Sequence, residues 1–172
     1  MKIKSNSIMN GYFKEDIGQL GNYFSKDTNL STYSFHLAWE DIPENTKSLA
    51  LIFIDHDAIP VCGFSWIHWT VANIDPNIKE LPENSSLQMD LLEGVNSWNS
   101  GIIPDQLKLN KDAATGFGGC APPDKNHLYT IEVYALDTHL NLERGFYMNE
   151  LLNEMKGHIL DKATIEALYK FK

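Results

Sequence analysis

Two carboxylates and an imidazole that could share a proton or bind an ion lie close together in the sequence. Asp55 and Asp57 follow the apolar run of residues 49–54, and His68 lies in the next apolar run. Carboxylates at the end of a buried segment are costly to desolvate, and repulsion between two of them raises one pKa. An imidazole beside them can offset that cost and donate to an oxyanion.

The two apolar runs predict the strands that position these side chains. Residues 49–54 contain no polar side chain and are rich in β-branched and aromatic types, which is typical of a central strand covered on both faces. Residues 67–74 predict a second strand, so that a pairing through the 56–66 loop places His68 opposite the acids. Two alternatives remain open: the acids only cap the loop, and the histidine is an ordinary core residue.

Two more candidate side chains begin a third strand. Residues 128–136 alternate in polarity, and His127 and Tyr129 are two apart, so they share a face. The preceding segment, residues 116–123, has three glycines and two prolines in eight positions. Its glycines could aim several backbone N–H groups at one anion, although an ordinary rigid loop is the alternative.

The remaining patterns indicate a mostly β protein. Residues 2–5 predict a short edge strand, and residues 34–39 alternate as a half-buried strand. Apolar side chains at helical spacing predict a helix over about 148–160. Residues 163–171 fit either a last strand or a helical continuation.

Composition limits the function classes. The 172 residues, 43% of them hydrophobic, are consistent with one domain over 1–172. With 14 basic against 23 acidic side chains and no run of Lys or Arg, we expect no nucleic-acid binding. No segment has the pattern of a signal peptide or reaches membrane-spanning length, so we expect a cytoplasmic protein without an integral membrane segment, in which Cys62 and Cys120 are free thiols.

The order of the motifs resembles one known family. Ser48-Leu-Ala-Leu, Asp55-x-Asp57-Ala and His68-Trp come first, and Gly116-Phe-Gly-Gly-Cys-Ala-Pro-Pro followed by His127-Leu-Tyr comes later. This order resembles the phosphatidylethanolamine-binding proteins, or Raf-kinase-inhibitor-like proteins, of the bacterial YbhB/YbcL type. The likeness runs from residue 34 to 169. It implies a Greek-key β-sandwich of two antiparallel sheets with peripheral helices, one of them near the C-terminus.

The resemblance also implies a site and a function. The site would be a small pocket for phosphate-like anions and phosphorylated headgroups, in a ligand-binding regulator of the kinase- or protease-inhibitor kind, with no catalytic residue, metal or cofactor. A regulated protein partner is implied as an option, and so is a homodimer. The family pattern assigns to this pocket Asp55, Asp57, Pro60, Trp66, His68, Gly119, Pro123, His127 and Tyr129.

The chain departs from the family pattern at several positions. Leu128 stands where the family usually has Arg, which removes a positive charge near the pocket mouth, and His56 stands where it usually has Pro. Residues 99–115 form an insertion beside the expected mouth. This insertion could act as a lid or an interface, or be a tolerated surface loop.

Two enzymatic readings compete with ligand binding. Asp55, Asp57, His68 and His127 have the side-chain types of a metal site, but they lack a dense ligand motif. Cys120 with His127 as its base would suit a hydrolase, but no orienting partner is evident. We therefore expect a binding protein without enzymatic activity.

Overall fold

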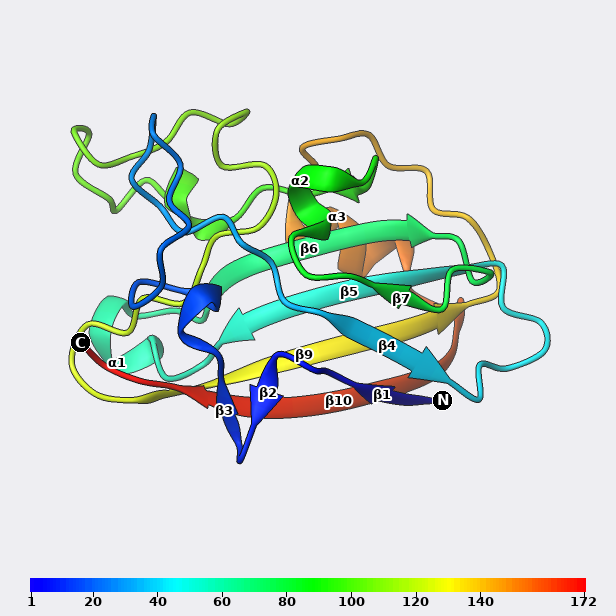
Figure 1. Ribbon diagram of the computed structural model, residues 1–172. Coiled ribbons are helices and arrows are strands. Elements are labelled where there is room, and N and C mark those ends of the chain that lie inside the picture. Colours follow the sequence, from blue (N-terminus) through cyan, green and yellow to red (C-terminus); the bar gives the residue numbers. More distant parts are fainter.

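The computed structural model describes residues 1–172 and contains two β-sheets that pack face to face (Figure 1). The small sheet has the order β1 (Lys2–Lys4), β4 (Leu37–Glu40), β7 (Glu80–Leu81). The large sheet has the order β2 (Ile8–Met9), β3 (Tyr12–Phe13), β10 (Ile159–Tyr169), β9 (His127–Leu136), β5 (Ser48–Asp55), β6 (Trp66–Ile74), β8 (Leu92–Glu93). The helical elements are η1 (Glu15–Ile17), α1 (Ile59–Cys62), α2 (Ser85–Gln88), η2 (Ser97–Asn99) and α3 (Met148–Glu154). The predicted mostly β sandwich is confirmed, and β3 and β10 form its one parallel pair of strands.

β5 is the central strand, as its uninterrupted apolar sequence predicts. All eight of its residues are buried, and it pairs with β6 on one side and β9 on the other. Leu51 and Phe53 point into the core between the two sheets, whereas Ile52 and Ile54 point into a second core. Helix α3, behind the large sheet in Figure 1, covers that second core. By alternation, Asp55 lies on the face that turns toward the small sheet.

A β-bulge sets the orientation of His68. Phe53 pairs with Trp69, but Ile54 pairs with Ile67, so that His68 is the extra residue in β6. Such an insertion bends the strand and changes the direction of a side chain. It brings His68 and Trp69, which are neighbours in sequence, onto the same side of the sheet as Phe53.

The C-terminal elements differ from the predicted helix of residues 148–160. Helix α3 ends at Glu154, and Gly157 follows with a φ of 80°, a conformation that favours glycine. The chain then enters β10, which pairs with β9 along the whole length of that strand. Residues 163–169 are therefore a strand, and the helical spacing of Ile159 with α3 does not continue the helix.

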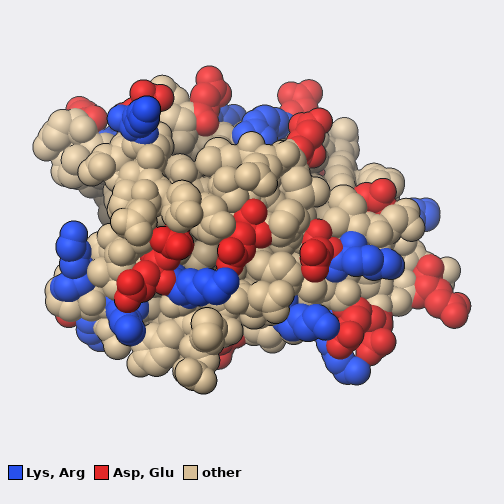
Figure 2. Space-filling view, viewed as in Figure 1, with Lys and Arg blue, Asp and Glu red and all other residues tan.

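Charges of both signs are mixed on the surface. On the face shown in Figure 2, basic and acidic side chains lie next to one another. One such ion pair joins Lys14 and Glu83 at 2.8 Å. No helix is both long and apolar enough to span a membrane.

A buried carboxylate connects β6, β8 and α2. Glu93 is 1% exposed and accepts hydrogen bonds from the Trp69 indole and the Ser86 hydroxyl. Its second oxygen lies 3.1 Å from the Arg144 guanidinium. The indole N–H of Trp69 is therefore satisfied inside the core.

We expect Glu93→Ala to destabilise the protein by about 1–3 kcal/mol, because the buried indole N–H would lose its acceptor. Urea unfolding followed by fluorescence measures the change. Glu44→Ala, at an exposed position, is the control and should change stability by less than about 0.5 kcal/mol. Equal effects of the two variants would contradict the role given to Glu93.

Candidate functional site

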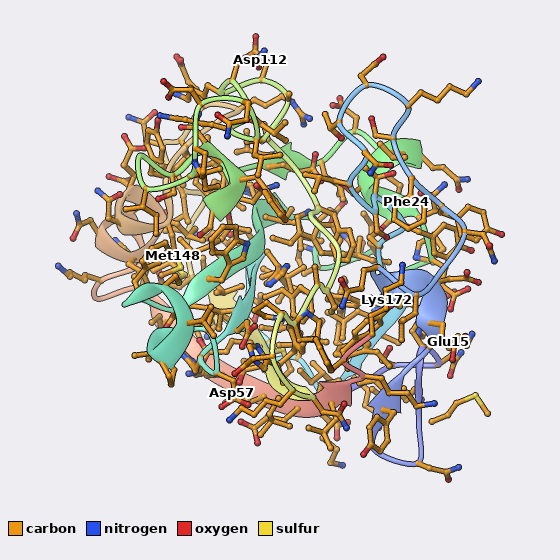
Figure 3. The ribbon with its side chains drawn as sticks, turned by 90° about the vertical axis from the view of Figure 1, so that its left-hand side faces the viewer. Glu15, Phe24, Asp57, Asp112, Met148 and Lys172 are labelled. Atoms are coloured by element: carbon orange, nitrogen blue, oxygen red, sulfur yellow. The ribbon has the colours of Figure 1, made fainter.

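A cavity of about 190 Å³ lies at the end of the large sheet where β5 ends and β6 and β9 begin. Figure 3 looks onto this end of the molecule, with α1 and Asp57 on its lower side and Asp112 of the 99–115 segment at the top. Three polar side chains reach an otherwise apolar wall. The lining residues are Asp55, Ala58, Val61, Cys62, Trp66, His68, Trp98, Ala121, Pro123 and His127.

A buried ion pair forms the polar side of the cavity. Nδ1 of His127 lies 2.7 Å from Oδ2 of Asp55, and both side chains are almost completely buried. Oδ1 of Asp55 also accepts the N–H of Ala58 at 3.2 Å, so the carboxylate anchors the turn into α1. Nε2 of His127 lies 2.8 Å from Oδ1 of Asp124. The charges are thus paired and hydrogen-bonded, which a buried ion pair requires.

The two acidic partners favour the protonated form of His127. Burial by itself lowers the pKa of His127, but the hydrogen bonds and charges of Asp55 and Asp124 outweigh burial and raise it above the usual value. Both ring nitrogens have a carboxylate partner, and carboxylates only accept, so both nitrogens donate. The hydrogen bond to His127 lowers the pKa of Asp124. This group of three therefore carries one positive and two negative charges.

The pKa of His68 is shifted in the opposite direction to that of His127. Burial lowers its pKa, against the smaller opposing effects of the Gly118 carbonyl and Asp55. Its Nδ1 lies 2.7 Å from the carbonyl oxygen of Gly118, and because a carbonyl only accepts, Nδ1 carries the hydrogen. His68 is therefore neutral near pH 7 and leaves Nε2 as an acceptor. It becomes a second cation only in acid.

The apolar wall comes from α1 and from two tryptophans. Ala58, Val61 and Cys62 follow helical spacing, so they line the same side of α1. The rings of Trp66 and Trp98 meet edge to face with centroids 5.2 Å apart. The indole Nε1 of Trp98 is buried and has no hydrogen-bond partner.

Five of the nine residues that the sequence assigned to the site line the cavity: Asp55, Trp66, His68, Pro123 and His127. Tyr129 does not, because it lies deeper, fully buried among the core aromatic rings. Its ring centroid is 5.2 Å from that of His68, so it supports the imidazole from behind.

Asp57 and Pro60 also lie outside the cavity. Oδ2 of Asp57 accepts the N–H of Leu128 at 2.9 Å, and so holds the loop before α1 to the start of β9. Pro60 is in the first turn of α1, where proline is favoured, and its side chain is exposed. The neighbouring residues of α1 line the cavity instead.

The glycine-rich segment is not an anion cradle. The N–H groups of residues 116–120 all donate within the protein: to Gly94 O, Ser86 Oγ, His68 O, Ser31 O and Ile17 O. Gly119 therefore packs rather than binds, since a Cβ there would lie 2.6 Å from the Cβ of Ser31. An anion in the cavity must use side-chain donors.

Sequence reasoning missed Ala58, Val61, Cys62, Trp98, Ala121 and Asp124. Only Asp124 had a usable signal, because an acid three residues before a histidine in a proline-rich turn can reach its ring.

The 99–115 segment follows Trp98 and folds back on it, since Leu109 N–H donates to Trp98 O at 3.0 Å. Asn99 also donates to the carbonyl of Leu109.

The geometry does not favour either enzymatic alternative over ligand binding. No group of three or more His, Cys, Asp or Glu side chains is arranged to hold a metal ion. Cys120 is fully buried in the core between the sheets, and burial raises the pKa of its thiol well above the usual range. A thiolate nucleophile is therefore disfavoured at this position.

Comparisons with known proteins agree on one family. A family model described as phosphatidylethanolamine-binding protein matches residues 6–170. The uncharacterised protein YxkA of Bacillus subtilis is 52% identical over 137 residues, which cover 78% of this chain and 80% of YxkA.

Two crystal structures have the same fold. One is a putative phosphatidylethanolamine-binding protein homologue from Chlamydia trachomatis, with a TM-score of 0.79, 28% identity, and coverage of 99% of this chain and 97% of that one. The other is YbcL of Escherichia coli, described as a new member of the mammalian PEBP family, with a TM-score of 0.75, 26% identity, and coverage of 99% of this chain and 98% of that one.

We expect the two cavity histidines to titrate on opposite sides of pH 6.5, the usual histidine pKa, with His127 above it and His68 below. Because the pKa of His127 is raised on folding, its pairing stabilises the protein fully below about pH 6.5 and less as pH rises through the folded pKa. NMR titration of the imidazole resonances tests the order. His127 titrating below His68 would contradict the assignment.

Asp55→Asn should therefore destabilise the protein by about 3–5 kcal/mol at pH 6, and by less once His127 is neutral. Urea unfolding at several pH values measures the difference. Asp137→Asn is the matched control, since Asp137 pairs with the exposed His158 at 2.8 Å. It should cost less than about 1 kcal/mol.

Proposed function

This chain belongs to the phosphatidylethanolamine-binding protein family, and we propose that it binds a small phosphate-like anion or phosphorylated headgroup in the cavity beside Asp55, His68 and His127. The observation that supports this most directly is a buried, protonated imidazole on the wall of an otherwise apolar cavity. Imidazolium N–H groups are strong donors to oxyanions.

The cavity dimensions favour a headgroup-sized ligand. Its volume of about 190 Å³ is below the range of about 300–1,000 Å³ that is usual for drug-sized ligands. The anionic end would lie at His127, and the less polar remainder would contact Trp66 and Trp98. An ammonium group on the same ligand would find Asp55 and the Nε2 acceptor of His68 nearby.

We propose that this site binds its ligand and does not catalyse a reaction. Both nitrogens of His127 already have carboxylate partners, and the only thiol on the cavity wall, Cys62, is directed toward the carbonyls of Ala58 and Phe64. None of these groups is an activated nucleophile. A regulated protein partner would then sense whether the cavity is occupied.

We expect sulfate to bind more tightly as pH falls below the lowered pKa of His68, because the imidazole then becomes a second cationic donor. Sulfate is the probe because its own charge does not change in this range. NMR titration between pH 4.5 and 7.5 measures the affinity. His68→Gln should remove this pH dependence, whereas His158→Gln, at an exposed surface pair, should keep it. Identical pH profiles for all three proteins would reject His68 as an anion contact.

A hydrolysis assay distinguishes the proposed binding function from an enzymatic one. We expect no hydrolysis of phosphomonoesters or carboxylic esters above the buffer rate. Asp55→Asn, measured under conditions where urea unfolding shows that the variant is folded, should then weaken phosphorylethanolamine binding with no catalytic change. Steady hydrolysis by the wild type that Asp55→Asn abolishes would replace the binding function with an enzymatic one.

A further inference from the structure

The outer donor of His127 is occupied by a carboxylate of the chain itself. Asp124 lies three residues before His127 on an exposed turn, its side chain is 50% exposed, and its oxygen is 2.8 Å from Nε2. Pro123, directly before it, lines the cavity, as does His127. The carboxylate thus lies at the rim of the cavity, against the only strong cationic donor there.

Charge balance does not require Asp124. The buried Asp55 carboxylate already neutralises His127, and it is held in place by the Ala58 N–H. A second carboxylate leaves the group with one excess negative charge. Because Asp124 is half exposed, water can solvate its carboxylate when it leaves, so breaking this contact costs far less than breaking the buried one.

We propose that Asp124 is an internal occupant of the anion site: its carboxylate holds Nε2 of His127 in the empty protein and is displaced when the anion of a ligand binds there. This inference rests on the proposed function. It adds that Asp124 competes with the ligand and so sets the ligand concentration that binding requires. Rotation of one side chain on an exposed turn is enough to exchange the partners. No movement of β9 or α1 is needed.

The competitor raises the ligand concentration that binding requires. A tethered group competes at an effective concentration of about the millimolar range or above, so every external anion must outcompete it. This competition lowers the apparent affinity of all external anions by the same factor. A monocarboxylate offers His127 the same type of acceptor that Asp124 already provides, whereas a phosphate monoester offers more charge and three acceptor oxygens. A phosphate-like dianion therefore displaces Asp124 at a lower concentration than a monocarboxylate does.

The test compares inorganic phosphate and acetate binding to the wild type, Asp124→Ala and Asp124→Asn by NMR at pH 6.5. Asp90→Asn is the matched control, because it removes the same charge from an exposed position without an imidazole partner. We expect both Asp124 variants to bind phosphate about tenfold more tightly, since no charge-assisted hydrogen bond must be broken first. Acetate affinity should rise at least as much, and Asp90→Asn should match the wild type.

A second readout reports the contact itself. In Asp124→Ala the pKa of His127 should fall, because one of its two acidic partners is gone, yet remain above that of His68. An unchanged His127 pKa would show that the contact does not exist in solution and would overturn the inference.

The binding outcomes separate the two proposals. Equal phosphate affinity in the wild type and both Asp124 variants would overturn the role of Asp124 and leave the anion site standing. An equal gain in Asp90→Asn would show a long-range charge effect and also overturn it. Absence of phosphate binding in every variant would reject the anion site, and the internal occupant with it.

Discussion

The buried contact between Asp55 and His127 is the constraint on which the geometry of the site depends. It joins the end of β5 to the start of β9, and the second oxygen of Asp55 fixes the turn into α1. Three elements are thus held by one carboxylate. The charges are stable there because every strong donor and acceptor of the pair is satisfied, which is the condition for burying an ion pair without a large penalty. The cavity is the space left beside this contact.

The strands were predictable from the sequence because their patterns are local. The apolar run of β5 and the alternation of β9 depend on which face each residue turns to, and their spacing placed His127 and Tyr129 on one face. In the structure Asp55 pairs with Tyr129 across the two strands. How deeply each side chain on that face lies in the core was not predictable. Tyr129 shares the face with His127 but lies one pair further into the core, where only packing against other elements decides its exposure.

Some features depend on partners that the local sequence does not reveal. Glycines at 116, 118 and 119 permit an anion cradle, yet their N–H groups are used by carbonyls from distant parts of the chain. The extra residue in β6 that orients His68 is likewise decided by its pairing with β5, and it leaves no sign in the sequence of β6 itself. The helix predicted over 148–160 was too long, because α3 ends at Glu154 and Gly157, in the turn that follows, has a positive φ.

The position of β10 has a consequence for how the protein folds. β10 is last in sequence, but it lies between β3 and β9, and Tyr169 pairs with His127 at the start of the site strand. The same tyrosine accepts from the N–H of Leu20 and donates to the carbonyl of Glu15. Contacts between such distant parts of a chain form slowly, since loop closure must precede them. The edge of β9 stays open until β10 pairs with it, so the wall of the cavity that β9 supplies is completed late in folding, and a nascent chain without β10 exposes an unpaired strand beside this cavity.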